Sequence, residues 1–247
     1  MIGLGKSIAE LKAEGYLPKN MDGASLPQNT AIAVKAAVLP FSRFRTPEGV
    51  VVDSLLSPEM RSTGEVMGLD TLYDTAFAKA QAGAGSPLPT EGKVFVSVAN
   101  HDKRNVIIYA KMLEQLGFEI VSTGGTADVL RRNGVNSTVA SKFAEANGQH
   151  SIVDMVRNGE IDLILNTPAG GAARSDGYEI RAAAVSVGCP VMTTISEFAA
   201  AVQAITALRE RSWEIINLQE HGEFLRTAST GEQGQDKGEQ VREGELS

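Results

Sequence analysis

Residues 122–126 read Ser-Thr-Gly-Gly-Thr, which places two glycines between hydroxyl side chains. The run follows a short strand-like segment at 117–121 and precedes a helical pattern at 127–132. Glycine lets a ligand approach the backbone closely, the amide groups at a helix start point outward, and Thr123 and Thr126 add hydroxyl donors. The pattern is typical of a turn that binds a phosphate. It fits equally well a tight turn in which Thr126 only caps the helix.

Two lysines, Lys103 and Lys142, and the segment 166–171 (Asn-Thr-Pro-Ala-Gly-Gly) offer further donors. Lysine supplies positive charge, while glycine backbone and hydroxyl groups supply directed hydrogen bonds, so the set suits a phosphate ester. A single lysine of this kind is more often a solvated surface residue. The prediction therefore depends on whether the fold brings these residues to one place.

Catalytic machinery is not evident in the sequence. His101 and His150 are not spaced with Ser, Cys or Asp as a nucleophilic triad would require, and no His, Asp or Glu spacing indicates a metal site. Asp102 is as well placed to cap a helix as to act as a base. We predict no catalytic residue and no metal ligand.

The elements that must position these residues alternate between strands and helices. Predicted strands cover 93–98, 118–121, 137–140, 161–165 and 191–192, with a last one at 213–218. Predicted helices cover 102–116, 127–132, 151–158, 176–187 and 196–209, the last capped by Ser196.

This alternation with short connections predicts a three-layer α/β domain around a mostly parallel sheet. Ligands of such sheets lie at the carboxyl ends of the strands. The segments at those ends are 99–103, 122–126, 141–142, 166–171 and 193–194. The candidate phosphate ligands therefore converge on one edge of the sheet.

Composition sets the limits of the prediction. The 247 residues have 43% apolar and 21% charged side chains, which is usual for a soluble globular protein of one or two domains. A net charge of −7 argues against a general nucleic-acid binder. The single cysteine, Cys189, excludes an internal disulfide framework and a Cys-rich metal site. No apolar run approaches the length of a membrane span and no secretory signal is evident, so we expect a cytoplasmic protein.

The first third of the chain is irregular by comparison. It offers strand-like runs at 31–41 and 50–56, a helix at 6–14 and a helix at 71–81 with Asp70 as N-cap, too few elements for a good core. A Gly- and Pro-containing linker follows at 82–90. We predict three regions: an incomplete unit at 1–85, the α/β domain at 86–222, and a polar tail at 223–247 that is expected to be disordered.

The α/β part resembles the methylglyoxal-synthase-like domain, through Asp102-Lys103, residues 122–126, Lys142, 158–160 and 166–170. The first third resembles the end of the second ATP-grasp unit of the carbamoyl phosphate synthetase large-subunit family, through 34–44, 58–68 and 76–80. The resemblance runs from about residue 4 to 222. It implies a C-terminal fragment that consists of an incomplete α+β ATP-grasp remnant and an allosteric domain.

The resemblance implies a regulatory function. In that family the C-terminal domain binds nucleoside monophosphates, UMP as inhibitor and IMP as activator of carbamoyl phosphate synthesis from bicarbonate, glutamine-derived ammonia and ATP. It implies no cofactor in this fragment but ATP with Mg or Mn in the intact subunit, and a glutamine amidotransferase small subunit as partner; a homo-oligomer is compatible with it. The residues that match the effector pocket are Ser97, Lys103, Thr123, Gly125, Thr126, Lys142, Asn166 and Thr167.

Two positions depart from the family pattern. Gly171 stands where family members often carry an arginine, so one phosphate or base contact is in doubt. Family members that respond to ornithine carry a glutamate at the position of Ala36, although Thr193 matches the threonine that contacts ornithine. The resemblance therefore makes ornithine a doubtful effector here.

Two other functions stay open. A stand-alone methylglyoxal synthase, a phosphate lyase, resembles the chain in the same cradle, but it needs a catalytic aspartate where residues 148–150 read Gly-Gln-His. Glutamine cannot exchange a proton near neutral pH, so this alternative lacks its acid–base group. A purely structural oligomerisation module would need no anion site, and ligand titration separates it from the regulatory hypothesis.

Overall fold

The structure is a computed structural model of the chain, and it describes residues 1–17, 31–39, 64–140, 151–167 and 173–213, together with Ile215, Asn217 and Glu220. The chain divides into two compact units, 1–31 with 215–247, and 32–214. The boundaries predicted near residues 85 and 222 stay predictions. None of the helices in the described residues has the length and apolar content of a membrane span.

The unit that contains the N-terminus holds a short 3-10 helix, η1 (Ile2–Leu4), and helix α1 (Ile8–Ala13). Ser7 caps α1 through a capping box: its Oγ accepts from the Glu10 N–H at 3.2 Å, and Glu10 Oε2 accepts from the Ser7 N–H at 2.7 Å. The hydrogen bond from the Ser7 backbone lowers the pKa of Glu10. Leu11 is the one buried residue of α1, and the capping box stabilises the start of this short helix.

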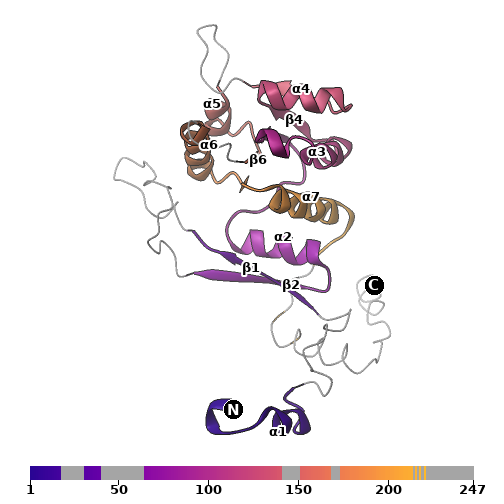
Figure 1. Cartoon of the computed structure of the whole chain (residues 1–247), viewed down its shortest axis with the longest axis vertical. Helices are drawn as coiled ribbons and strands as arrows, with labels where there is room; N and C mark the ends of the chain where they lie inside the picture. The colour runs from indigo at the N-terminus through magenta and orange to yellow at the C-terminus, as the bar shows by residue number, and fades with distance from the viewer. Residues whose placement is uncertain are drawn as a thin grey trace, which may run out of the picture. The chain divides into compact units, whose positions relative to one another are not determined.

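A five-stranded parallel sheet forms the centre of the larger unit (Figure 1). Its strands lie in the order β5-β4-β3-β6-β7. They are β3 (Lys93–Ser97), β4 (Glu119–Ser122), β5 (Thr138–Val139), β6 (Leu163–Asn166) and β7 (Val191–Met192). All four pairings are parallel, as the strand–helix alternation of the sequence predicted.

Helices cover both faces of this sheet. Apolar side chains of α3 (Val106–Gln115), α4 (Gly124–Arg132) and α7 (Ile195–Glu210) pack with Val94 and Val96 on one face. Those of α5 (Ile152–Arg157) and α6 (Ala173–Val187) pack with Phe95 on the other. Successive residues of a strand point to opposite faces, which is why neighbours in β3 belong to two different cores. The predicted three-layer α/β architecture is confirmed.

Three local predictions about this domain are wrong. The helix predicted to begin at Asp102 begins at Val106, because η3 (Asn100–Asp102) and a turn come first. The cap of α7 is Thr194 rather than Ser196, and its side chain accepts from the Glu197 N–H at 3.2 Å. No strand is present at the described positions of the last predicted one, which include Trp213 and Ile215.

An outer layer lies against α7 (Figure 1). It consists of the antiparallel pair β1 (Ile32–Ala37) and β2 (Glu65–Asp70), followed by α2 (Tyr73–Gly83). Helix α2 contacts the strand pair on one side and α7 on the other, and Phe77 of α2 belongs to the same apolar core as Phe198 of α7. Gly68 makes the close approach of β2 possible, since a Cβ there would lie 2.0 Å from the Ala76 carbonyl oxygen.

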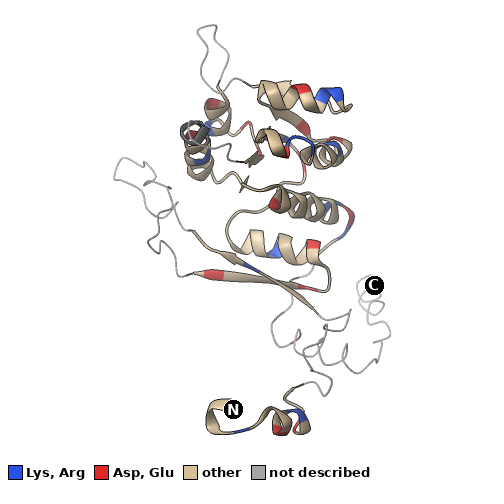
Figure 2. Ribbon diagram, viewed as in Figure 1, with Lys and Arg blue, Asp and Glu red and all other residues tan. Residues whose placement is uncertain are grey.

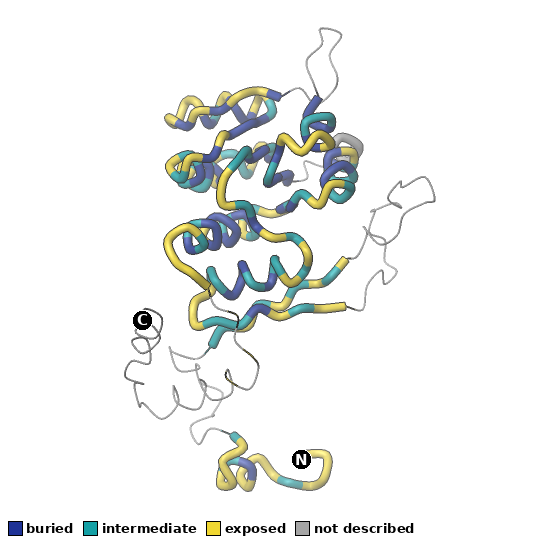
Figure 3. Tube along the Cα trace, turned by 180° about the vertical axis from the view of Figure 1, so that it is seen from behind, coloured by how far each residue is buried: buried dark blue, intermediate teal, exposed yellow. Residues whose placement is uncertain are grey.

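The strand pair itself is much less buried than the parallel sheet (Figure 3). Residues of β1 alternate between half-buried and exposed, which is the pattern of a strand covered on one face. The predicted strand-like run at 50–56 lies outside the described residues.

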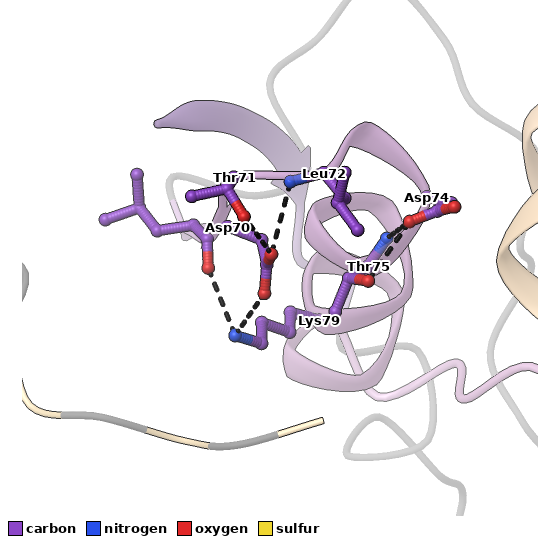
Figure 4. A network of polar contacts seen from close by, with 7 residues as sticks. Asp70, Thr71, Leu72, Asp74, Thr75 and Lys79 are labelled. Carbon is purple, nitrogen blue, oxygen red and sulfur yellow. Dashed lines mark hydrogen bonds and ion pairs between the residues drawn. The ribbon is translucent and has the colours of Figure 1, made fainter. Parts of the chain in front are cut away.

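A polar network joins the end of β2 to the start of α2 (Figure 4). Lys79 Nζ donates to Asp70 Oδ2 at 2.8 Å and to the Leu69 carbonyl at 3.2 Å, while Asp70 Oδ1 accepts from the Leu72 N–H at 3.2 Å. Lys79 and Asp74 are the only charged residues of α2 and are visible as its blue and red segments in Figure 2. Asp70 was predicted to be the N-cap of α2, but Leu72 occupies that position. The Leu72 N–H donates a hydrogen bond to Asp70.

Candidate functional site

The strand order creates a crevice at the carboxyl ends of β3 and β6. These strands are neighbours, yet the helix that follows β3 lies on one face of the sheet and the helix that follows β6 lies on the other. The two connections therefore diverge at this point, which is where open α/β sheets bind ligands. The order of the strands and the faces on which their helices lie therefore determine the position of the crevice.

Hydrogen bonds between Ser97, Ala99 and Thr167 fix the two strand ends that form this crevice. Ser97 lies beside Asn166 in the register of the sheet. The Thr167 N–H donates to the Ser97 carbonyl at 3.1 Å, and the Thr167 hydroxyl oxygen accepts from the Ala99 N–H at 2.9 Å. Thr167 is buried. Its hydroxyl oxygen thus holds the chain that follows β3.

The predicted phosphate cradle is the start of a helix. Helix α4 begins at Gly124, so both glycines lie in its first turn, and neither has a positive φ. This corrects the expected turn at 122–126. Thr123 occupies the N-cap position without a side-chain capping bond, and its Oγ1 donates to Thr126 Oγ1 at 3.3 Å. Thr126 therefore does not cap the helix. Among the described residues, the amide groups of Gly124 and Gly125 in the first turn have no hydrogen-bond partner.

Lys103 reaches the same place from the segment that follows β3. Its Nζ lies 3.0 Å from where a Cβ would stand on Gly125. A helix start carries partial positive charge, so an ammonium beside it is unfavourable unless an anion lies between or near them. The absence of a side chain at Gly125 leaves room for this approach. Four of the predicted residues therefore come together at the start of α4: Lys103, Thr123, Gly125 and Thr126.

The remaining predicted residues are placed less closely or not at all. Lys142 lies outside the described residues. Thr193 lies at the start of α7, where its N–H donates to Glu197 Oε2 at 2.9 Å. It lines a cleft of about 790 Å³ that includes Thr167, Arg104 and Tyr109 but none of the other predicted effector residues. Ala36 lines a separate cavity of about 530 Å³, which Glu197 also lines.

Cys189 is not a candidate nucleophile. Burial, together with the negative charge of Asp162, raises the pKa of its thiol to about 12. The thiol therefore stays protonated near neutral pH, whereas the thiolate is the reactive form of cysteine. Its Sγ lies 3.4 Å from the Ile161 carbonyl oxygen. These surroundings are those of a structural thiol.

Two residues of α6 that the sequence reasoning missed also face this edge. Gly177 is buried, and a Cβ built on it would lie 2.9 Å from Arg181 Nη1 and 3.0 Å from Asn166 Nδ2. Asn166 is 7% exposed, and its Nδ2 has no hydrogen-bond partner among the described residues. A glycine in the interior of a long helix was the available signal, since glycine disfavours helix formation.

Comparison with known proteins shows which proteins the chain is similar to. Residues 105–193 match the family model of the MGS-like domain. The chain is 63% identical over 238 residues to the carbamoyl phosphate synthase large chain of Kocuria rhizophila, an alignment that covers 96% of this chain and 22% of the relative.

Similar matches occur in other organisms. The large chain of Pseudarthrobacter chlorophenolicus is 63% identical over 229 residues, covering 91% of this chain and 21% of the relative. That of Streptomyces coelicolor is 54% identical over 227 residues, with 91% and 21% covered. The chain thus spans about a fifth of the length of the curated relatives it matches.

Proposed function

We propose that this chain, a segment of the carbamoyl phosphate synthase large-chain family that carries an MGS-like domain, is a regulatory module that binds nucleoside monophosphates at the carboxyl edge of its parallel sheet. UMP is the proposed inhibitor and IMP the proposed activator. In the whole protein their binding would adjust the synthesis of carbamoyl phosphate from bicarbonate, glutamine-derived ammonia and ATP. The ATP, its Mg or Mn ions and the glutamine amidotransferase small subunit belong to that larger assembly.

The observation that carries the proposal is the position of Lys103 at the start of α4. The Lys103 ammonium lies 3.0 Å from the Cβ position of Gly125, beside helix amides that have no partner among the described residues. A phosphate would complete such a site. Thr123 and Thr126 add hydroxyl groups at the same point. The cradle thus supplies hydrogen-bond donors and positive charge, which suit the binding of a phosphate.

Binding at this edge could reach the outer layer through α7. This helix packs on the sheet and also on α2, so a displacement of α7 by an effector changes the contacts of the layer formed by α2, β1 and β2. Coupling free energies of this kind are typically about 1–3 kcal/mol. We infer that this packed path links the effector site to the remainder of the large chain.

The test is isothermal titration calorimetry of the chain with UMP and with IMP. We expect binding by the wild type and a loss of about ten- to a hundredfold in affinity for Lys103→Ala, because a hydrogen bond to a charged group contributes about 1.5–3 kcal/mol. Lys111→Ala is the matched control, since Lys111 is exposed on α3. The absence of a binding signal at millimolar concentrations of both nucleotides would refute the proposal, and so would an unchanged affinity in Lys103→Ala.

Regulation itself is tested in the full-length large chain with its small subunit. We expect UMP and IMP, varied separately, to change the rate of carbamoyl phosphate synthesis, and the Lys103→Ala enzyme to lose this response while it keeps its basal rate. A structural oligomerisation module would show no such response. Ornithine is the third compound to vary, because Ala36 replaces the glutamate that responsive relatives carry.

A further inference from the structure

Helix α7 connects the carboxyl edge of the parallel sheet with the outer layer. It begins at Ile195, directly after Thr194, which lines the cleft of about 790 Å³ together with Thr167. It ends 16 residues later at Glu210, so its two ends are about 24 Å apart. Rigid helices that are packed on both sides can carry a displacement from one end to the other. A displacement at the start of α7 therefore also displaces its carboxyl end.

Two arginines at this carboxyl end hold α7 to different neighbours. The Arg209 guanidinium donates to the carbonyl of Leu116, the C-cap residue of α3. Arg211, the C-cap residue of α7, donates from Nη2 to Asp74 Oδ2 at 2.8 Å, and Asp74 lies in the first turn of α2. One arginine thus attaches α7 to a helix that covers the parallel sheet, and the other attaches it to the outer layer.

The Asp74 carboxylate is oriented to accept from Arg211. Its Oδ1 accepts from the Thr75 N–H at 2.6 Å and from the Thr75 hydroxyl at 3.1 Å, which leaves Oδ2 for the guanidinium (Figure 4). The charges also suit the two helix ends, because an acidic residue is favourable in a first turn and a basic residue at a carboxyl end. Both partners are therefore held in place by their own helices before they pair.

This ion pair differs in kind from the other contacts between α2 and α7. The two helices share an apolar core that includes Phe77 and Phe198, and hydrophobic contacts are not directional. A charge-assisted hydrogen bond has a defined geometry. Of the ion pairs between described residues, Asp74–Arg211 is the one that joins the outer layer to α7. It therefore fixes the position of α2 along α7.

We propose that the Asp74–Arg211 ion pair is the contact through which a displacement of α7 by a bound nucleotide reaches the outer layer. This regulatory device rests on the proposed function, in which the nucleotide binds at the carboxyl edge of the sheet. When the start of α7 is displaced, Arg211 at its end moves Asp74 and the first turn of α2. The strand pair follows, because α2 packs on β1 and β2. Without the ion pair the apolar surfaces slide past each other, and the response is weaker.

The test compares Arg211→Gln, which removes the charge, with Arg211→Lys, which keeps it, in the full-length large chain with its small subunit. We expect UMP to change the rate of carbamoyl phosphate synthesis by the wild type. The factor of this change should fall about two- to fivefold in Arg211→Gln, the range for a partly exposed ion pair. Arg211→Lys should keep most of the response, and the basal rates of both variants should equal that of the wild type.

Two measurements on the 247-residue chain separate this effect from binding and folding. UMP affinity in calorimetry should be unchanged in Arg211→Gln, because Arg211 lies at the end of α7 that is remote from the carboxyl edge. The melting temperature should fall by no more than about 4 °C, because the side chains of Asp74 and Arg211 are 23% and 43% exposed.

Glu65→Gln is the matched control, since the Lys35–Glu65 ion pair lies within the strand pair of the same outer layer. It should leave the response to UMP intact. Asp74→Asn completes a double-mutant cycle: combined with Arg211→Gln, it should weaken the response no further than either substitution alone.

The outcomes distinguish the two proposals. If UMP neither binds the wild type nor changes its rate, the proposed function fails and the role of the ion pair with it. If the wild type responds and Arg211→Gln responds equally, or if the effects of Asp74→Asn and Arg211→Gln add, the ion pair alone is refuted. A loss of UMP affinity in the Arg211→Gln chain would show that Arg211 maintains the binding site itself, which would also overturn its role in transmission.

Discussion

Two clusters of polar side chains in the larger unit differ in how far their hydrogen-bonding groups are paired. At the junction of β2 and α2, the Asp70 carboxylate accepts hydrogen bonds from Lys79 and from the Leu72 N–H. Lys79 also donates to the Leu69 carbonyl (Figure 4). At the carboxyl edge of the parallel sheet, Lys103 lies beside a helix start and Asn166 Nδ2 has no described partner. A charge that is fully paired stabilises the fold, whereas donors that converge without acceptors indicate a ligand.

The largest effect expected from this comparison is on stability at the β2–α2 junction. Lys79→Met should lower the free energy of unfolding by about 1.5–3 kcal/mol, because it leaves the half-buried Asp70 carboxylate without its charged donor. Urea denaturation measures the change, and UMP affinity should stay at the wild-type value. Lys35→Met is the control, since the Lys35–Glu65 pair is exposed at both ends and should change stability by less than about 1 kcal/mol. If Lys79→Met were as stable as the wild type, the paired charges at the β2–α2 junction would not stabilise the fold, and the difference between the two clusters would disappear.

The second prediction is that the contribution of Asp70 to the stability of the fold depends on pH. Burial would raise the pKa of Asp70, but the hydrogen bond from Lys79, that from the Leu72 N–H and the charge of Lys79 hold it below its ordinary value. A carboxyl with a lower pKa in the folded state stabilises the fold above its unfolded pKa of about 3.9, and this contribution is lost as the pH falls through the folded pKa.

We therefore expect the stability difference between the wild type and Asp70→Asn to be constant from about pH 7 to 5 and to shrink below about pH 4. Urea titrations at a series of pH values measure it. A difference that persisted unchanged at pH 3 would mean that the charge of Asp70 contributes nothing to the fold.

The smallest effect is expected at Asn166. Asn166→Ala should change the free energy of unfolding by less than about 1 kcal/mol, because no hydrogen bond of its Nδ2 to a described group is lost. Ser122→Ala is the matched control. Ser122 is also buried, but its Oγ accepts a hydrogen bond from the Ser137 hydroxyl at 2.9 Å, so we expect a loss of about 1 kcal/mol. If Asn166→Ala were more destabilising than Ser122→Ala, Asn166 would stabilise the fold, as the paired side chains at the β2–α2 junction do.

Much of the fold was predictable because its signals are local. The apolar run at 161–165 predicted a buried strand, and β6 is buried at every residue. The helix predicted at 151–158 is α5, with Ser151 as its cap, and Gly159 follows it with a φ of 72°. The resemblance to the carbamoyl phosphate synthase large chain and the MGS-like domain is confirmed by the comparisons.

Other features were missed because tertiary contacts decide them. Glycine is a poor helix former, so the helix was predicted to begin at residue 127, whereas α4 begins at Gly124. The convergence of Arg181 and Asn166 depends on how α6 packs over β6, which no local pattern of residues contains. The sequence thus predicted the candidate residues that directly follow the strands, and it missed those that belong to α6.

The burial of α7 between the parallel sheet and α2 has a consequence for modularity. Its buried residues include Phe198 and Ile205 and five positions of alanine or valine, and the same apolar core includes Phe77 of α2. A parallel-sheet domain transferred to another protein without α2 would therefore carry an open apolar surface along α7. The unit that can be exchanged between proteins, by recombination or in the design of chimaeras, is therefore the parallel-sheet domain together with α2.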